Sequence, residues 1–299
     1  MITTDLKKYY DPTFTVSDLY KASLPDIQNS KESRIEGANV AIQQVGISNF
    51  RMPLSFPKKD GGSLSLETSV DGYVSLEADK KGINMSRLMR SFYKFKDEPF
   101  TKEIFEYILK VYRRDLDSKA SYLRLAFSWP MLVKSLRSGL EGYQYYDAAI
   151  EGQMDQKGHM RRFLHLDFVY SSACPCSFEL SEHARETRDT IGIPHSQRSL
   201  AHITVEMADD LHVEDLIELC REALVTETQV MVKREDEQAF AEMNGAYQKF
   251  VEDAARLLYE RLKNDKGIKD FVVRCVHMES LHSHDAVSRI SKGVEGGLR

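Results

Sequence analysis

Residues 143–170 read YQYYDAAIEGQMDQKGHMRRFLHLDFVY. Two segments rich in aromatic and apolar residues, 143–151 and 161–170, flank a polar stretch that ends in a glycine, 153–158. Segments of this length and composition, separated by a short polar turn, are typical of a β-hairpin. The stretch therefore predicts two antiparallel strands near the middle of the chain, and an antiparallel sheet as the framework of the fold.

Strand-like and helix-like segments continue on both sides of this hairpin. Residues 70–75 alternate between small or apolar and more polar side chains, which is typical of a strand buried on one face. Ile104, Phe105 and Ile108 form one apolar stripe at helical spacing. Antiparallel hairpins with helices packed on one face predict an α+β fold. Further strands are expected at residues 40–50, 64–76, 122–127, 199–207, 228–232 and 268–278, and helices at 86–94, 101–115, 176–190, 213–224 and 237–263.

Composition excludes several classes of protein. The formal net charge of −5 argues against non-specific binding of nucleic acid, which needs a basic field. No run approaches the roughly 18 apolar residues of a membrane span, and the first residues lack the order of a signal peptide. The four cysteines are too few for a disulfide framework. We therefore expect a cytoplasmic protein that binds neither membrane nor nucleic acid.

Cys174 and Cys176 flank Pro175 directly after the strand expected at 161–170. Proline fixes φ near −65° and removes a backbone donor, so the pair forms a stiff corner. The two cysteines are too close for the usual C-x2-C metal knuckle, and a disulfide between them would be strained. One interpretation is that one thiolate points into a site and its neighbour points elsewhere. A buried structural pair in a strand-to-helix corner explains the same residues.

His195 lies in an irregular turn, GIPHSQRS (192–199), before the strand expected at 199–207. Together with Cys174 it offers soft and borderline ligands for a metal. Gln197 and Arg198 suit the recognition of a planar base or a phosphate. A histidine in a loop is nevertheless most often only solvated.

Charged residues gather at KREDE (233–237), between the strand expected at 228–232 and the helix expected at 237–263. Such a run is most often a solvated helix start, with its acids stabilised by the helix dipole. Glu237 also follows a strand end, where side chains tend to line clefts, so it is a candidate carboxylate ligand. Lys233 and Arg234 are then available to an anion.

Two more segments offer polar groups for a ligand. In ESLHSH (279–284), His282 and His284 are two residues apart, so in an extended chain both point to one side. Glu279 offers a carboxylate that fits an N–H pair such as that of guanine or a pterin; a polar turn capping the sheet is the simpler explanation. Asn84 and Arg87 open the helix expected at 86–94, which makes either an anion site or a plain helix cap.

Six segments together resemble one family, GTP cyclohydrolase IB, the bacterial enzymes of the tunnelling fold. They run in the family's order over residues 52–284, so the resemblance covers most of the chain. The segments are Asp60-Gly-Gly62 after Met52-Pro-Leu, Lys81-Gly-Ile-Asn-Met-Ser-Arg87, Ser172-Ala-Cys-Pro-Cys-Ser177, His195-Ser-Gln-Arg-Ser199, Val232-Lys-Arg-Glu-Asp-Glu237 and Glu279-Ser-Leu-His-Ser-His284.

The resemblance implies a fold, an assembly and a reaction. The fold is two tunnelling-fold modules in tandem, which we place at residues 37–137 and 138–288, with an N-terminal arm at 1–36 and a mobile tail at 289–299. The assembly is a homo-oligomer, a tetramer with active sites at subunit interfaces. The reaction is hydrolytic opening of GTP to 7,8-dihydroneopterin triphosphate and formate, which leads to tetrahydrofolate and, in many bacteria, to queuosine-type deazapurines.

The resemblance also implies roles for residues. Cys174, His195 and Glu237 would hold one divalent metal ion per site, zinc, manganese or ferrous iron, and Cys174 would also be catalytic. Such an ion with an open position makes a strong nucleophile from water at neutral pH, which hydrolysis at C8 of guanine requires. Glu279 would anchor the guanine edge, and His282 with His284 would transfer protons. Further substrate-binding residues would be Gln197, Arg198, Arg87, Lys233 and Arg234.

Three features depart from the family's pattern. Asn84 stands where the family usually has histidine, Phe178 stands where it usually has lysine, and the stretch from Cys174 to His195 is longer than usual. Three other functions remain open: an archaeal-type cyclohydrolase that gives a cyclic phosphate, a non-catalytic binder of purines or pterins, and a thiol redox pair at Cys174 and Cys176. The binder would need Glu279 but neither Cys174 nor Glu237, so their presence argues against it.

Overall fold

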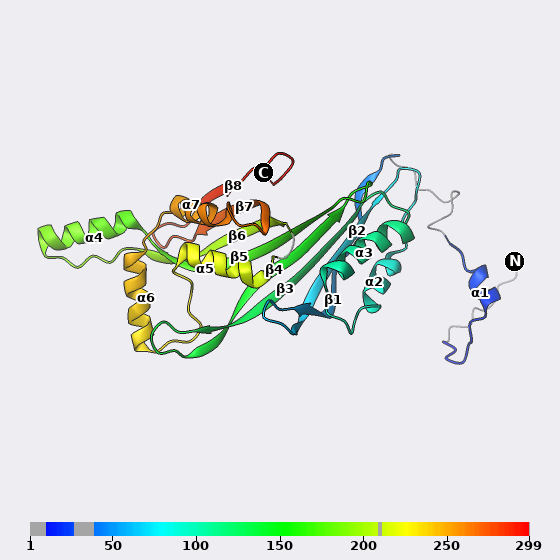
Figure 1. Ribbon diagram of the computed structural model, residues 1–299, viewed down its shortest axis with the longest axis horizontal. Coiled ribbons are helices and arrows are strands. Elements are labelled where there is room, and N and C mark those ends of the chain that lie inside the picture. The colour runs from blue at the N-terminus through cyan, green and yellow to red at the C-terminus, as the bar shows by residue number, and fades with distance from the viewer. Residues whose placement is uncertain (1–9, 27–38, 209–210, 299) are drawn as a thin grey trace, which may run out of the picture.

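The computed structural model describes residues 10–26, 39–208 and 211–298 (Figure 1). An eight-stranded sheet runs through the molecule, and the chain visits its strands in order from one edge to the other. The strands are β1 (Ile42–Pro57), β2 (Ser63–Leu76), β3 (Ser121–Lys134), β4 (Glu141–Met154), β5 (Met160–Ala173), β6 (Ser196–Met207), β7 (Ile268–His277) and β8 (Ala286–Ser291). The helices are α1 (Asp18–Ser23), α2 (Met85–Tyr93), α3 (Lys102–Asp115), α4 (Pro175–Arg188), α5 (Val213–Leu224), α6 (Arg234–Ala246) and α7 (Val251–Leu262).

Every neighbouring pair of strands is antiparallel, as the sequence predicts. The hairpin expected at residues 143–170 is formed by β4 and β5, which pair from Met154 opposite Met160 to Asp147 opposite Asp167. Beyond Asp147 the two strands separate. On that side of β5, Tyr170 instead forms a single bridge with Glu227.

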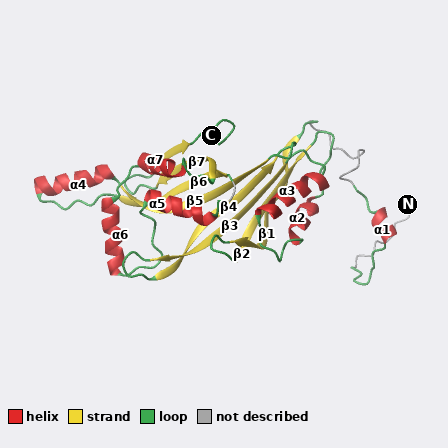
Figure 2. Ribbon diagram, in the orientation of Figure 1, coloured by secondary structure: helices red, strands yellow, loops and turns green. Residues whose placement is uncertain are grey.

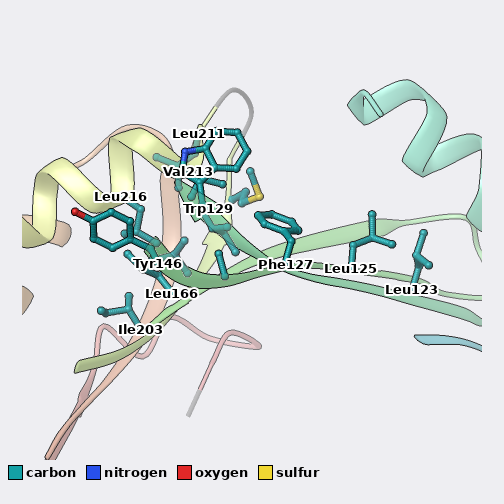
Figure 3. Packing of buried hydrophobic residues seen from close by; sticks show 14 of the residues in the cluster. Leu123, Leu125, Phe127, Trp129, Tyr146, Leu166, Ile203, Leu211, Val213 and Leu216 are labelled. Atoms are coloured by element: carbon teal, nitrogen blue, oxygen red, sulfur yellow. The ribbon is translucent and has the colours of Figure 1, made fainter. Parts of the chain in front are cut away.

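Helices α2, α3, α5 and α7 cover one face of the sheet (Figure 2). The strands turn alternate apolar side chains to this face, because successive residues of a strand point to opposite sides. Around Phe127 and Trp129, side chains of the central strands pack under Val213 and Leu216 of α5 (Figure 3). The core thus lies between the sheet and these helices, as the predicted one-sided α+β arrangement requires.

The opposite face of the sheet is polar where it crosses β4, β5 and β6. His165 Nε2 lies 3.0 Å from a carboxylate oxygen of Glu151, and His202 Nδ1 lies 2.7 Å from one of Asp167. These residues alternate along their strands with the buried Leu166 and Ile203. The sheet therefore separates an apolar, helix-covered face from a face that carries hydrogen-bonded histidine–carboxylate pairs.

The order strand, strand, helix, helix, strand, strand occurs twice if α4 and α6 are regarded as insertions. The first repeat is β1, β2, α2, α3, β3, β4, and the second is β5, β6, α5, α7, β7, β8. This repetition favours a boundary between modules in the turn that joins β4 to β5. The predicted boundary at 137/138 falls instead between β3 and β4, which pair along their whole length.

The prediction of one long helix at 237–263 is wrong. The chain forms two helices, α6 and α7, and turns between them at residues 247–250. Lys249 N donates to the carbonyl of Ala173 at 3.3 Å, and Phe250 N donates to the side chain of Asp253 at 3.0 Å. The apolar spacing continues across the turn, so periodicity alone does not reveal the break.

Two other expectations need correction. The strand expected at 228–232 is absent, and the nearest strand-like pairing is the single bridge of Glu227 with Tyr170. The tail expected from residue 289 begins inside a strand, because β8 extends to Ser291 and pairs with β7. After β8, the backbone N–H groups of Gly293, at 3.0 Å, and of Leu298 donate to the side chain of Asp270, a buried residue of β7.

Candidate active site at the ends of strands β5 and β6

Cys174 and His195 lie opposite one another where β5 ends and β6 begins. The last ladder pair is Ala173 with Ser196, and Cys174 N donates to the carbonyl of His195 at 3.2 Å just beyond it. Directly opposed residues of an antiparallel pair point to the same face of a sheet. The two proposed ligands, 21 positions apart in sequence, are thus adjacent in space.

The chain between these two residues forms α4, which projects from the end of the sheet (Figure 1). Cys174 is the N-cap of α4, and Pro175 occupies the first helical turn, where proline needs no backbone donor. The Cys174 side chain makes no capping hydrogen bond, so its thiol is not used by the helix. The amino end of a helix favours a negative charge such as a thiolate.

Polar side chains extend from His195 into the interior. His195 Nδ1 lies 3.1 Å from Gln197 Oε1, and Gln197 Nε2 donates to Ser172 Oγ at 2.6 Å. Ser172 and Ser199 are fully buried, and their hydroxyl oxygens are 2.8 Å apart. Gln197 therefore already has partners for both ends of its amide.

A second cluster of buried polar side chains lies on the same face of the sheet. His277 Nε2 is 2.9 Å from the hydroxyl of Tyr170, and Lys249 Nζ donates to Thr226 Oγ1 at 3.0 Å. Burial lowers the pKa of Lys249 to about 8. Burial, together with the nearby charge of Lys249, lowers the pKa of His277 to about 4. His277 is opposite Ser199 in the sheet, so this cluster lies next to the hydrogen-bonded side chains that extend from His195 to Ser199.

Glu279, His282 and His284 follow the end of β7. Glu279 is half-buried and lies two residues beyond His277. The rings of His282 and His284 are stacked, with centroids 4.8 Å apart, and both side chains are exposed. The expectation that the two imidazoles lie on one side is confirmed, although their backbone forms a turn and is not extended.

Glu237, Lys233 and Arg234 lie at the amino end of α6 and are exposed. The buried Asp236 anchors this end: its carboxylate accepts from Lys233 N at 2.8 Å, from Ser138 N at 2.9 Å and Oγ at 2.5 Å, and from Arg137 N at 2.8 Å. Burial opposes ionisation of Asp236, but these hydrogen bonds outweigh it and lower the pKa of the carboxyl well below its usual range. The start of α6 is therefore fixed to the β3–β4 connection.

This arrangement holds Glu237 away from Cys174 within one chain. The end of α6 that reaches β5 is the carboxyl end, where Lys249 contacts Ala173. At 1.5 Å per residue, Glu237 lies roughly 14 Å further along the helix axis. In the described part of the chain, no three His, Cys, Asp or Glu side chains are grouped so that they could hold a metal ion.

Arg198 and Arg87 are placed elsewhere. Because β6 begins at Ser196, three residues earlier than expected, Gln197 and Arg198 point to opposite faces of the sheet. Arg198 is exposed on the face that carries no helices. Arg87 lies on α2, at the other end of the sheet from α4 (Figure 1), and donates to the carbonyl of Asp115 at 2.5 Å.

The donor set of Cys174 and His195 fits a divalent metal ion in part. A thiolate and an imidazole both suit zinc and iron, whereas manganese prefers oxygen ligands such as a carboxylate. His195 Nδ1 is occupied by Gln197, which leaves Nε2 to face a ligand. One chain places these two residues opposite one another, and Glu237, the third predicted donor, does not join them within that chain.

Comparison with known proteins identifies the family. A family model described as type I GTP cyclohydrolase FolE2 matches residues 24–288. The chain belongs to this family. The GTP cyclohydrolase FolE2 of Roseobacter denitrificans is 58% identical over 291 residues, 96% of this chain and 79% of that protein. The one from Dinoroseobacter shibae is 58% identical over 292 residues, with the same shares of the two chains. The resemblance found in the six segments is thus confirmed.

A solved structure confirms the fold. This FolE2 chain resembles the crystal structure of uricase from Arthrobacter globiformis with a TM-score of 0.50 at 7% sequence identity, over 86% of this chain and 95% of that one. At this identity the likeness concerns the fold alone, an α+β arrangement of the tunnelling type. Within the described residues, no helix is long and apolar enough to cross a membrane.

The candidate site also includes buried residues that the sequence does not indicate. Four residues that are not predicted as site residues, Lys249, His277, Ser172 and Ser199, are buried near Cys174 and His195. A signal is present for three of them, because Ser172, Ser199 and His277 each follow or precede an apolar residue two positions away on the strand: Tyr170, Ala201 and Cys275. Buried polar groups require partners, so such interruptions indicate a polar network. Lys249 gave no such signal, because it lies in a turn that the sequence did not predict.

Proposed function

We propose that this chain is a metal-dependent GTP cyclohydrolase that converts GTP and water to 7,8-dihydroneopterin triphosphate and formate. The observation that carries the proposal is the pairing of Cys174 with His195 at the ends of β5 and β6, in a chain that belongs to the FolE2 family. The product leads to tetrahydrofolate, and a second use in deazapurine synthesis is part of the proposal. The cytoplasm is the proposed location.

The chain's own residues divide the work of binding and proton transfer. Cys174 and His195 would hold the metal ion, which supplies the nucleophile for attack at C8. Glu279, half-buried beyond β7, would accept hydrogen bonds from the N–H pair of guanine. His282 and His284 are exposed and their rings are stacked, so a bound ligand can reach both, and they would deliver protons to the imidazole nitrogens of the opening ring.

Completion of the site requires a second copy of the chain. Glu237 lies at the amino end of α6, and only the other end of this helix approaches Cys174. The contacts of Asp236 fix the amino end in place. We therefore propose a homo-oligomer, a tetramer, in which Glu237 of one copy joins Cys174 and His195 of a neighbour. Lys233 and Arg234 would accompany Glu237 and bind phosphates. Arg87, at the other end of the sheet, would serve an interface as well.

Two other functions are distinguished by their products. An archaeal-type enzyme would release a cyclic phosphate from the same substrate. A non-catalytic purine or pterin binder would retain GTP unchanged, and it would need neither Cys174 nor Glu237. The presence of both residues, in a chain of this family, favours the cyclohydrolase.

The test is incubation of the purified full chain with GTP, with zinc, manganese, ferrous iron or a chelator in parallel. After oxidation, the pterin product is followed by its fluorescence, and its phosphate form by mass. Neopterin triphosphate that depends on a metal supports the proposal. A cyclic phosphate supports the archaeal type, and intact GTP with every ion overturns the enzymatic proposal.

A further inference from the structure

A row of hydrogen-bonded side chains leads from His195 into the core under the helix-covered face of the sheet. It runs from His195 Nδ1 to Gln197 Oε1, from Gln197 Nε2 to Ser172 Oγ, and from Ser172 Oγ to Ser199 Oγ. Gln197 is half-buried, and the two serines have no exposed surface. The outer end of this row is a proposed metal ligand, whereas its inner end is fixed in the core.

The amide of Gln197 determines which groups donate and which accept along this row of hydrogen bonds. Its nitrogen only donates and its oxygen only accepts. In the structure the nitrogen donates to Ser172 and the oxygen lies 3.1 Å from His195 Nδ1, and this orientation of the amide pairs with a proton on Nδ1. A neutral imidazole carries one proton, so Nε2 is then the nitrogen with a free lone pair. Metal ions bind that unprotonated nitrogen.

We propose that Gln197 is a positioning residue that fixes the tautomer of His195, so that Nε2 is ready to bind the metal ion next to Cys174. The inference rests on the proposed metal site of the preceding section. It replaces the expected role of Gln197 in substrate binding, because both ends of its amide are already hydrogen-bonded. Partners of this kind orient ligating histidines and raise their basicity in metal sites generally.

The two serines make the arrangement rigid. Each occupies a helix-facing position of a central strand, where Phe168, Tyr170 and Ala201 pack in the core. A buried hydroxyl without a partner is unfavourable. Ser172 and Ser199 are hydrogen-bonded to each other, and Ser172 Oγ also accepts from the amide nitrogen of Gln197. Reversal of the Gln197 amide would reverse the proton on His195 and place it on the nitrogen that should bind metal.

The inference is tested first by the state of the imidazole in the metal-free full chain. Nitrogen NMR distinguishes protonated from unprotonated ring nitrogens, and the signals of His195 are assigned by their loss in His195→Asn. At a pH well above 7, where imidazoles are neutral, we expect the proton on Nδ1 in the unaltered chain and in Gln197→Glu, which keeps the acceptor. In Gln197→Met we expect the proton to shift substantially to Nε2.

The second measurement is the affinity for zinc alone. We expect Gln197→Met to lose roughly 10- to 100-fold and Gln197→Glu to stay close to the unaltered chain. An Nε2–H ring in the unaltered metal-free chain overturns the inference, as does a Gln197→Met variant with an unchanged tautomer and unchanged zinc affinity. Absence of zinc binding by the unaltered chain contradicts the proposed metal site instead, and the NMR result then still decides the role of Gln197.

Discussion

The backbone amide of Cys174 donates to the carbonyl oxygen of His195 at 3.2 Å, one step beyond the last paired residues of β5 and β6. This bond joins the two ends of an excursion that contains all of α4. Because the strands fix the register on the other side, the backbones of Cys174 and His195 are held opposite one another whatever the length of the excursion. The longer stretch between Cys174 and His195 is therefore compatible with a working site.

Glu237→Ala should abolish cyclohydrolase activity and weaken metal retention without loss of folded protein. Glu237 is exposed in the first turn of α6, so its removal leaves no cavity in the core. The matched control is Glu235→Ala, which removes an exposed carboxylate from the same turn. Turnover and bound metal are measured on both variants. Turnover of Glu237→Ala equal to that of the control would contradict the ligand assignment.

A mixture of two inactive variants tests the composite site. Cys174→Ala and Glu237→Ala subunits are dissociated, mixed and reassembled. If Glu237 joins Cys174 of a neighbouring copy, some mixed sites contain both native residues and part of the activity returns. If both ligands come from one copy, every site in the mixture lacks one of them, and the activity stays at the level of the separate variants.

Glu279→Ala should lose binding of GTP and keep its metal ion. Glu279 lies beyond β7, apart from the proposed ligands in sequence, and its proposed partner is the guanine edge. Removal of one carboxylate that accepts two hydrogen bonds should cost on the order of 3 kcal/mol, or about 100-fold in affinity. Calorimetry with GTP and metal analysis check the two parts. An unchanged GTP affinity would remove Glu279 from the substrate site.

His277 should make the folded protein less stable in mild acid. Its pKa is lowered to about 4 from an ordinary value of 6.5, because the ring is buried and Lys249 is near. Between these values the unfolded chain binds a proton that the folded chain does not, so this contribution to stability is complete above pH 6.5 and is lost as the pH falls to 4. The loss is on the order of 3 kcal/mol.

Chemical denaturation across this pH range, compared with His277→Gln, isolates the effect. The variant should show a shallower fall in the free energy of unfolding between pH 6.5 and 4. Equal slopes for the two proteins would mean that His277 does not carry the predicted pH dependence.

Gly152→Ala should destabilise the sheet where α3 approaches it most closely. A Cβ at Gly152 would lie 2.2 Å from Cε1 of the buried Phe105, so helix and strand would have to separate. Overpacking of this kind costs about 1–3 kcal/mol. Gly245→Ala is the control, because a Cβ there meets nothing within 4 Å and alanine is the better helix former. The midpoint temperature of thermal unfolding should fall for Gly152→Ala and should not fall for Gly245→Ala.

Local patterns in the sequence predict much of this fold. Helix α5 has the expected bounds, 213–224, because its apolar residues recur at helical spacing between clear ends. The hairpin of β4 and β5 follows from its two apolar segments and polar turn. Strand ends are predicted less well: β6 begins at Ser196, and those three residues decide that Gln197 and Arg198 face opposite ways.

The parts that were missed depend on contacts between distant residues. The break between α6 and α7 is held by Lys249 N and the carbonyl of Ala173, which are 76 positions apart, and the apolar stripe continues through it. The lowered pKa values of Lys249 and His277 arise from burial that only the folded chain creates. For the candidate site, the sequence supplied Cys174 and His195, whereas the network behind them required the register of β5, β6 and β7.

The most direct test of the central claim is release of formate from GTP labelled at C8. The account predicts that the purified chain, with zinc, manganese or ferrous iron, releases labelled formate in equal amounts with the pterin triphosphate, and that Cys174→Ala releases none. Recovery of bound GTP with its label intact in the presence of each ion would contradict the account.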